Sequence, residues 1–260
     1  MTGMTNDKAM KFYDITGSYL PDTAADSVLR NRVEAGALEC HLSALTERFA
    51  ELSHQAAPAK ALADIDLQKA RTMVNLDRGE EAWPLARDAL DVFLESSDFE
   101  SAADACDVLF QSGQPTSLAA LGQGIWLAVT YPIDPELTVE LLSHVVEETP
   151  DTADGAAVAA TTAVFLAELR ATGKSRENLV FFASQLLGRV AQRHSGVVTQ
   201  DEFDQWMDRL ELREPDKFLV RLRNVVDVLV QDEWWFDRDA LLARLPDEPR
   251  TAPSPHQADG

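Results

Sequence analysis

The apolar residues of this chain recur three and four positions apart along most of its length. In segment 203–210, for example, they follow the i, i+3, i+4, i+7 spacing that places side chains on one face of a helix. No segment shows the sustained alternation of apolar and polar residues, with β-branched residues and hairpin turns, that is typical of a strand. We therefore predict an all-α fold.

Proline, glycine and capping residues divide this pattern into about eleven helices joined by short loops. Pro58 ends the first helix, and Asp134 followed by Pro135 is a typical helix start. Eight predicted helices have two bounds: Asp22 to Pro58, 60–77, 99–112, Thr116 or Ser117 to about Val129, Asp134 to Glu148, 156–171, Ser175 to Arg193, and 237–245. The other three are predicted by their starts, at Glu80, Thr199 and Pro215.

The 260 residues are enough for one large domain with its own core. We expect an N-terminal arm over 1–20, a single helical domain over 21–246, and a disordered, proline-containing tail over 247–260. The first residues lack the apolar run of a secretory signal, and no apolar stretch is long enough to span a bilayer. Two cysteines exclude a disulfide scaffold and a multi-cysteine zinc module. A cytoplasmic protein is the expectation.

Small residues are spaced as in a closely packed helical hairpin between Ala70 and Ala89. Ala82 and Ala89 are seven positions apart, and Gly79 precedes them at the turn between two predicted helices. About 35 residues around this segment resemble a tetratricopeptide repeat, in which small residues let the two helices of a repeat approach closely. The resemblance implies antiparallel hairpins stacked as an α-solenoid, with a concave protein-binding groove. An ordinary amphipathic hairpin with alanines at its contact is the alternative.

The negative charge of the chain is concentrated in one block. Residues 80–169 hold 17 acidic residues and one basic residue, Arg87, a net charge of −16 out of −21 for the whole chain. Asp88, Asp91 and Glu95 share one helix face by their spacing, and Asp98 continues it. Because like charges at this spacing destabilise a helix, an ordinary solvated face would contain interleaved lysines.

We interpret the acidic block as a surface that holds a Lys- or Arg-rich segment of another protein. A generally acidic surface that favours solubility is the alternative. The residues predicted to contact the partner electrostatically are Asp88, Asp91, Glu95, Asp98, Glu100 and Asp104, with Trp126 and Tyr131 as apolar anchors nearby.

Several other kinds of chemistry are disfavoured. The charge argues against nucleic acid and anionic membranes as partners. The five histidines have no metal-ligand spacing, so we expect no metal site and no cofactor. The segment Gly122-Gln123-Gly124 lacks the context of a phosphate-binding loop and predicts tight helix packing or a bend. The aromatic cluster Trp234-Trp235-Phe236 is either a core plug at the C-terminal end or an anchor at a partner interface.

The expected function is therefore a non-enzymatic protein-binding adaptor, assembly factor or chaperone. One alternative is a structural subunit of a larger complex. The other is an all-α enzyme, which would require acidic residues or His144 to converge in a concave site with strongly shifted pKa values.

Overall fold

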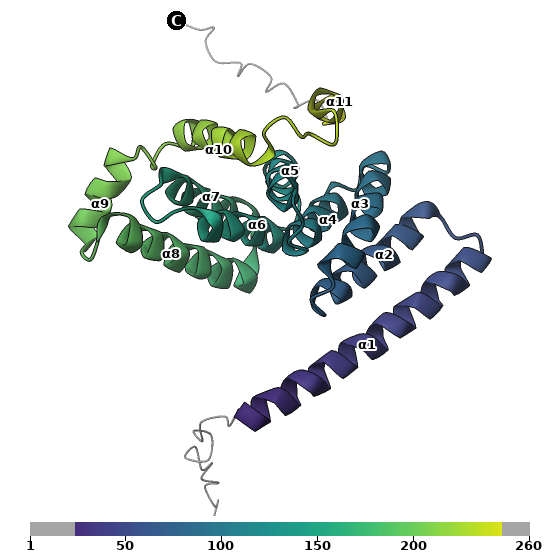
Figure 1. Cartoon of the computed structure of the whole chain (residues 1–260). Helices are drawn as coiled ribbons and strands as arrows, with labels where there is room; N and C mark the ends of the chain where they lie inside the picture. Colours follow the sequence, from purple (N-terminus) through teal and green to yellow (C-terminus); the bar gives the residue numbers. More distant parts are fainter. Residues whose placement is uncertain (1–23, 246–260) are drawn as a thin grey trace, which may run out of the picture.

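The computed structural model describes the backbone of residues 24–245 and the side chains from residue 33 onward. The predicted arm over 1–20 and the predicted tail over 247–260 lie outside the described residues. Between 24 and 245 the regular secondary structure consists of eleven α-helices and no strand, so the predicted all-α class is confirmed (Figure 1). The helices are α1 (Ala24–His54), α2 (Ala59–Val74), α3 (Gly79–Glu95), α4 (Phe99–Gln111), α5 (Ser117–Thr130), α6 (Pro135–Glu148), α7 (Asp154–Arg170), α8 (Gly173–Ser195), α9 (Gln200–Arg209), α10 (Pro215–Val230) and α11 (Arg238–Leu242).

Successive helices pack against one another from α1 to α9. Beyond these neighbours, α2 contacts α4, α4 contacts α6, and α6 contacts α8, so these four helices form one layer, called here the even-numbered layer. On the other side, α10 crosses α5 and α7 (Figure 1). α1 packs against α2 alone and buries only Leu42 and Leu45 among its described side chains.

The alanines of the α2–α3 hairpin lie at a close helix contact. Ala70, Ala82 and Ala89 are all buried. Gly79, the first residue of α3, approaches the turn after α4 so closely that a Cβ there would stand 2.0 Å from the carbonyl oxygen of Ser112. Small residues in this segment therefore set the distances between α2, α3 and α4.

Two glycines allow the same close packing around α5. A Cβ on Gly122 would lie 2.6 Å from Cγ2 of Val230 in α10, and one on Gly124 would lie 2.9 Å from Cβ of Cys106 in α4. The tight packing predicted for this segment is confirmed. Gln123 between them is fully buried and binds the C-terminal segment, because its Oε1 accepts a 2.9 Å hydrogen bond from the backbone N–H of Trp235.

The aromatic cluster at 234–236 packs on the chain's own helices, as the core-plug interpretation predicted. Trp235 meets Trp83 of α3 edge-on at 5.9 Å between ring centroids, and Phe236 lies 5.5 Å from Trp126 of α5. The guanidinium of Arg87 covers Trp235 at 4.8 Å. The segment after α10 thereby covers the sides of α3 and α5 that face away from the even-numbered layer.

Candidate functional site

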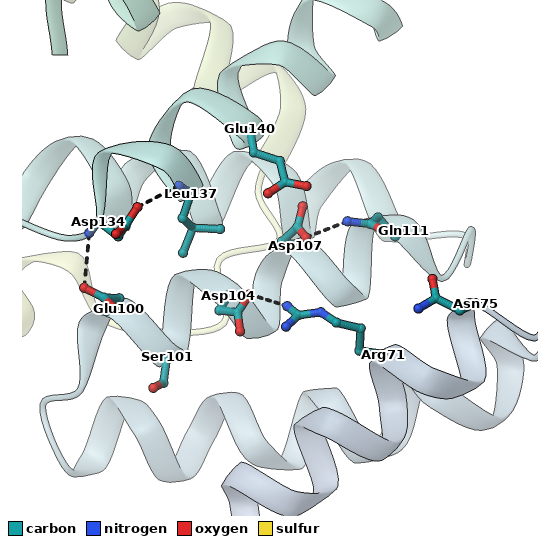
Figure 2. A pocket seen from close by; sticks show the side chains of 10 residues that line it. All are labelled: Arg71, Asn75, Glu100, Ser101, Asp104, Asp107, Gln111, Asp134, Leu137 and Glu140. Carbon is teal, nitrogen blue, oxygen red and sulfur yellow. Dashed lines mark hydrogen bonds and ion pairs between the residues drawn. The ribbon is translucent and has the colours of Figure 1, made fainter. Parts of the chain in front are cut away.

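A polar cleft of about 520 Å³ opens on the even-numbered layer, between α2, α4 and the start of α6 (Figure 2). It forms there because the acidic residues of α4 recur at helical spacing and face the groove between α2 and α6. Five carboxylates and one guanidinium line it. The lining residues are Arg71, Asn75, Glu100, Ser101, Asp104, Asp107, Gln111, Asp134, Leu137 and Glu140.

Arg71 is the one basic side chain among the described residues that line the cleft, and it lies in the middle of the cleft. Arg71 reaches from α2 and forms an ion pair with Asp104 of α4 (Figure 2). Both side chains are partly exposed, so this pair contributes little to stability. It neutralises one of the five carboxylates and leaves the cleft with a large excess of negative charge.

The outer end of the cleft is held by backbone hydrogen bonds. The backbone N–H of Asp134 donates to the Glu100 carboxylate at 3.1 Å, which ties the start of α6 to the start of α4. Asp134 itself caps α6, since its Oδ1 accepts from the N–H of Glu136 at 2.6 Å. Both acidic side chains are therefore fixed in position while remaining exposed to solvent.

At the inner end, two carboxylates and an imidazole converge. Oδ1 of Asp107, a residue only 3% exposed, lies 3.0 Å from Nε2 of His144. Its Oδ2 accepts a 2.5 Å hydrogen bond from the Gln111 amide. Glu140 lies one turn before His144 on α6, and Figure 2 shows its carboxylate facing that of Asp107. One donor atom from each of Asp107, Glu140 and His144 falls within 4.8 Å of the other two.

This convergence shifts two pKa values upward. Burial by itself lowers the pKa of His144, but the hydrogen bond and negative charge of Asp107, with the charges of Glu147 and Glu140, outweigh it and raise the pKa. Burial raises the pKa of Glu140, and the charge of Asp107 raises it further. Of the residues that converge here, Asp107 and Glu140 line the cleft, and His144 contacts Asp107 beside it.

The predicted acidic contact residues fall into two groups in the structure. Glu100 and Asp104 line the cleft, whereas Asp88, Asp91 and Glu95 are exposed on α3 and do not. The sixth residue, Asp98, caps α4 by accepting from the N–H of Ser101 at 3.2 Å and pairs with Lys60 at 2.7 Å.

The two predicted apolar anchors lie outside the cleft and pack on the side of the aromatic cluster, where Trp126 contacts Trp234 and Phe236. Tyr131 is 3% exposed, stacks on Phe99 at 3.6 Å, and donates a 2.7 Å hydrogen bond to the carbonyl of Leu241. Trp126 is half-buried and meets Tyr131 edge-on at 6.2 Å. Both side chains hold α5 and the loop after it against the C-terminal segment.

Sequence reasoning missed Asp134 and Glu140 as cleft residues and did not select Asp107. The i, i+4 spacing of Glu140 and His144 is a signal that could have placed both on one face of α6. The sequence does not show that this face contacts Asp107, because the contact depends on how α4 packs against α6.

No family model matches this chain, and comparisons with curated proteins and with solved structures gave no significant match. Among the helices of the described range, none is both long and apolar enough to cross a membrane. We therefore infer function from the chemistry of the cleft alone.

Proposed function

We propose that this chain is a non-enzymatic adaptor or assembly factor that holds a Lys- or Arg-rich segment of a partner protein in the acidic cleft. The observation that carries the proposal is the lining of the cleft, with five carboxylates against the one guanidinium of Arg71. A cleft lined by charges of one sign concentrates and steers ligands of the opposite sign.

The arrangement of the cleft carboxylates supports a basic side chain as the ligand. Asp104 is already paired with Arg71, but Glu100, Asp134 and Glu140 make no ion pair with any Lys or Arg among the described residues. A guanidinium or ammonium group entering the cleft would find free carboxylate oxygens and form charge-assisted hydrogen bonds. Arginine is favoured, since its planar group can bind a carboxylate through two parallel hydrogen bonds.

The order of the helices supports a repeat scaffold as the framework of this cleft. The hairpins α2–α3, α4–α5 and α6–α7 follow one another, and the first helix of each contacts the first helix of the next. This is the arrangement expected of tetratricopeptide-like hairpins stacked as an α-solenoid, whose inner helices form the binding groove. The return of α10 over α5 and α7 departs from a simple repeat and leaves the cleft side open.

The test measures binding of a fluorescent Arg/Lys-rich peptide by anisotropy, with a Glu-rich peptide as the negative control. Glu100→Gln combined with Glu140→Gln removes two cleft charges and keeps similar side-chain shapes. Two partly exposed ion pairs contribute about 1–2 kcal/mol in total, so we expect the dissociation constant to rise about five- to thirtyfold. Wild-type affinity should also fall strongly between about 50 and 500 mM salt, since salt screens exposed charges.

A matched control separates the cleft from the acidic face of α3. Asp88→Asn combined with Glu95→Gln also removes two exposed charges, but from residues outside the cleft. We expect this control to bind nearly as the wild type does. Equal loss in the two double variants would show a general effect of net charge, and loss in the control alone would place the binding surface on α3. Either outcome would overturn the proposal.

A further inference from the structure

We propose that Asp107, Glu140 and His144 bind a divalent transition-metal ion of the Zn²⁺ type at the inner end of the cleft. The sequence led us to expect no metal site, because the histidines have no local ligand spacing. Here the ligands come from two helices, α4 and α6, that are adjacent only in the folded chain. The two proposals share Glu140, but the metal site is tested on the chain without any partner, so each proposal can fail separately.

The distances suit a small coordination sphere. Zn²⁺ binds imidazole nitrogen and carboxylate oxygen at about 2.0–2.2 Å, so neighbouring ligand atoms of a tetrahedral site are about 3.3 Å apart. Oδ1 of Asp107 and Nε2 of His144 are 3.0 Å apart, and an oxygen of Glu140 lies within 4.8 Å of both. A tetrahedral site therefore requires the Glu140 oxygen to move closer to the other two ligand atoms.

The burial of Asp107 favours a cation beside its carboxylate. Carboxylates that are almost fully buried are normally paired with a cation or coordinate a metal ion, because an isolated buried charge is costly. Among the described residues, no Lys or Arg pairs with Asp107, and its carboxylate contacts only the neutral amide of Gln111 and the ring of His144. Protonated His144 supplies a positive charge beside Asp107 in the metal-free chain, and a metal ion bound to Oδ1 and Nε2 would take the place of the Nε2 proton.

The surrounding groups orient the ligands in the way that metal sites require. The Gln111 amide donates a hydrogen bond to Oδ2 of Asp107, so Oδ1 is the oxygen that faces His144. Without a metal ion, the Nε2–H of His144 donates to Oδ1 of Asp107, so a metal ion bound between these two atoms would replace that proton. On the far side of the ring, Nδ1 lies 3.8 Å from the Glu147 carboxylate. The ring of Phe110 packs on the imidazole at 4.7 Å between centroids and limits its rotation.

The donor set also indicates which ions fit. An imidazole nitrogen with two carboxylates suits Zn²⁺ and its first-row neighbours, whereas Mg²⁺ and Ca²⁺ prefer oxygen ligands alone. Three protein ligands leave at least one coordination position for water or for a ligand that enters the cleft.

The experiment is titration of the full chain, freed of metal with a chelator and desalted, with Zn²⁺ by isothermal titration calorimetry. Titration with Co²⁺ adds a visible absorption band that reports four- or five-coordination. We expect one ion per chain, retained in excess Mg²⁺. We further expect at least about a 100-fold loss of affinity in both His144→Gln and Glu140→Gln. Glu140 is exposed, so Glu140→Gln leaves the core unchanged and is the decisive variant.

The matched control is His194→Gln. His194 also pairs with an aspartate, Asp154, at 3.2 Å, but that pair has no third donor in the described part of the chain. We expect this variant to keep wild-type Zn²⁺ affinity. Absence of saturable binding, displacement by Mg²⁺, or equal affinity of the wild type and Glu140→Gln would each overturn the proposal. None of these outcomes depends on whether the chain binds a basic peptide.

Discussion

The contact between α5 and α10 depends on the absence of a side chain at Gly122, and alanine at this position tests that directly. An added Cβ would stand 2.6 Å from Cγ2 of Val230, 3.0 Å from Cβ of Leu229 and 3.3 Å from the carbonyl oxygen of Val226. Carbon atoms in contact prefer about 3.5–4.0 Å, so α10 must move away from α5 by roughly 1 Å. Overpacking of this kind costs about 1–3 kcal/mol.

The helix propensity of alanine opposes this cost. Alanine is favoured over glycine inside a helix by about 1 kcal/mol. Because the Cβ of Leu229 is attached directly to the backbone and Val230 is a stiff β-branched residue, we expect the clash to prevail. The net prediction is that Gly122→Ala lowers the free energy of unfolding by up to about 2 kcal/mol.

Gly188 provides the internal control. It lies inside α8 with no atom within 4 Å of the position of its added Cβ, so Gly188→Ala should gain about 0.5–1 kcal/mol from propensity alone. Urea unfolding of both variants, followed by far-UV circular dichroism, measures the two changes. We expect the free energy of unfolding to fall in Gly122→Ala and to rise in Gly188→Ala. If both alanines stabilised the protein equally, the close approach of α10 to α5 would be refuted.

Two further predictions concern residues first selected as binding residues. Tyr131→Phe should lower the unfolding free energy by about 0.5–1.5 kcal/mol, because it removes the buried hydrogen bond to the carbonyl of Leu241, which then keeps only the N–H of Arg244 as a donor, and amide hydrogen exchange should accelerate in α11. Asp98→Asn tests a pH dependence. Burial raises the pKa of Asp98, but hydrogen bonds from Lys60 and Ser101 outweigh it, so the folded-state pKa lies below the usual value. The stability that this carboxylate contributes is therefore complete above its unfolded-state pKa of about 3.9 and is lost as the pH falls through the lower folded-state value. Asp98→Asn should destabilise the protein at pH 7 and much less at pH 3 in urea titrations, and an equal difference at both pH values would contradict the assigned ion pair.

The helices themselves could be predicted from local sequence because their ends are encoded locally. Asp134 caps α6 with Pro135 at its first position, and Thr199 forms a capping box with Glu202 at the start of α9. The ends of α1 and α2 were predicted four and three residues too late, at Pro58 and at 77, and the start of α8 was misplaced where no capping signal exists. α8 begins at Gly173, two residues before the expected Ser175, and no side chain caps it.

The candidate site could be predicted only in part. The excess of negative charge and the acidic face of α4 were visible in the sequence, and Glu100 and Asp104 do line the cleft. The sequence could not show that the acids of α3 lie outside it, since that follows from how α3 packs between its neighbours. For the same reason it could not bring Asp107 to His144, which is 37 positions later.

The return of the C-terminal segment to the middle of the chain has a consequence for folding. In a simple repeat array each unit contacts only its neighbours, so units can open one at a time. Here Gln123 binds the backbone near Trp235, 112 positions away, and α10 joins α5 to α7. The units from α3 to α10 are therefore coupled into one cooperative block, which completes its core only after residue 235 has been synthesised. Among the described helices α1 packs against α2 alone, with one further ion pair from Glu39 to Arg78 at the start of α3, so it lies outside that block and opens at lower cost.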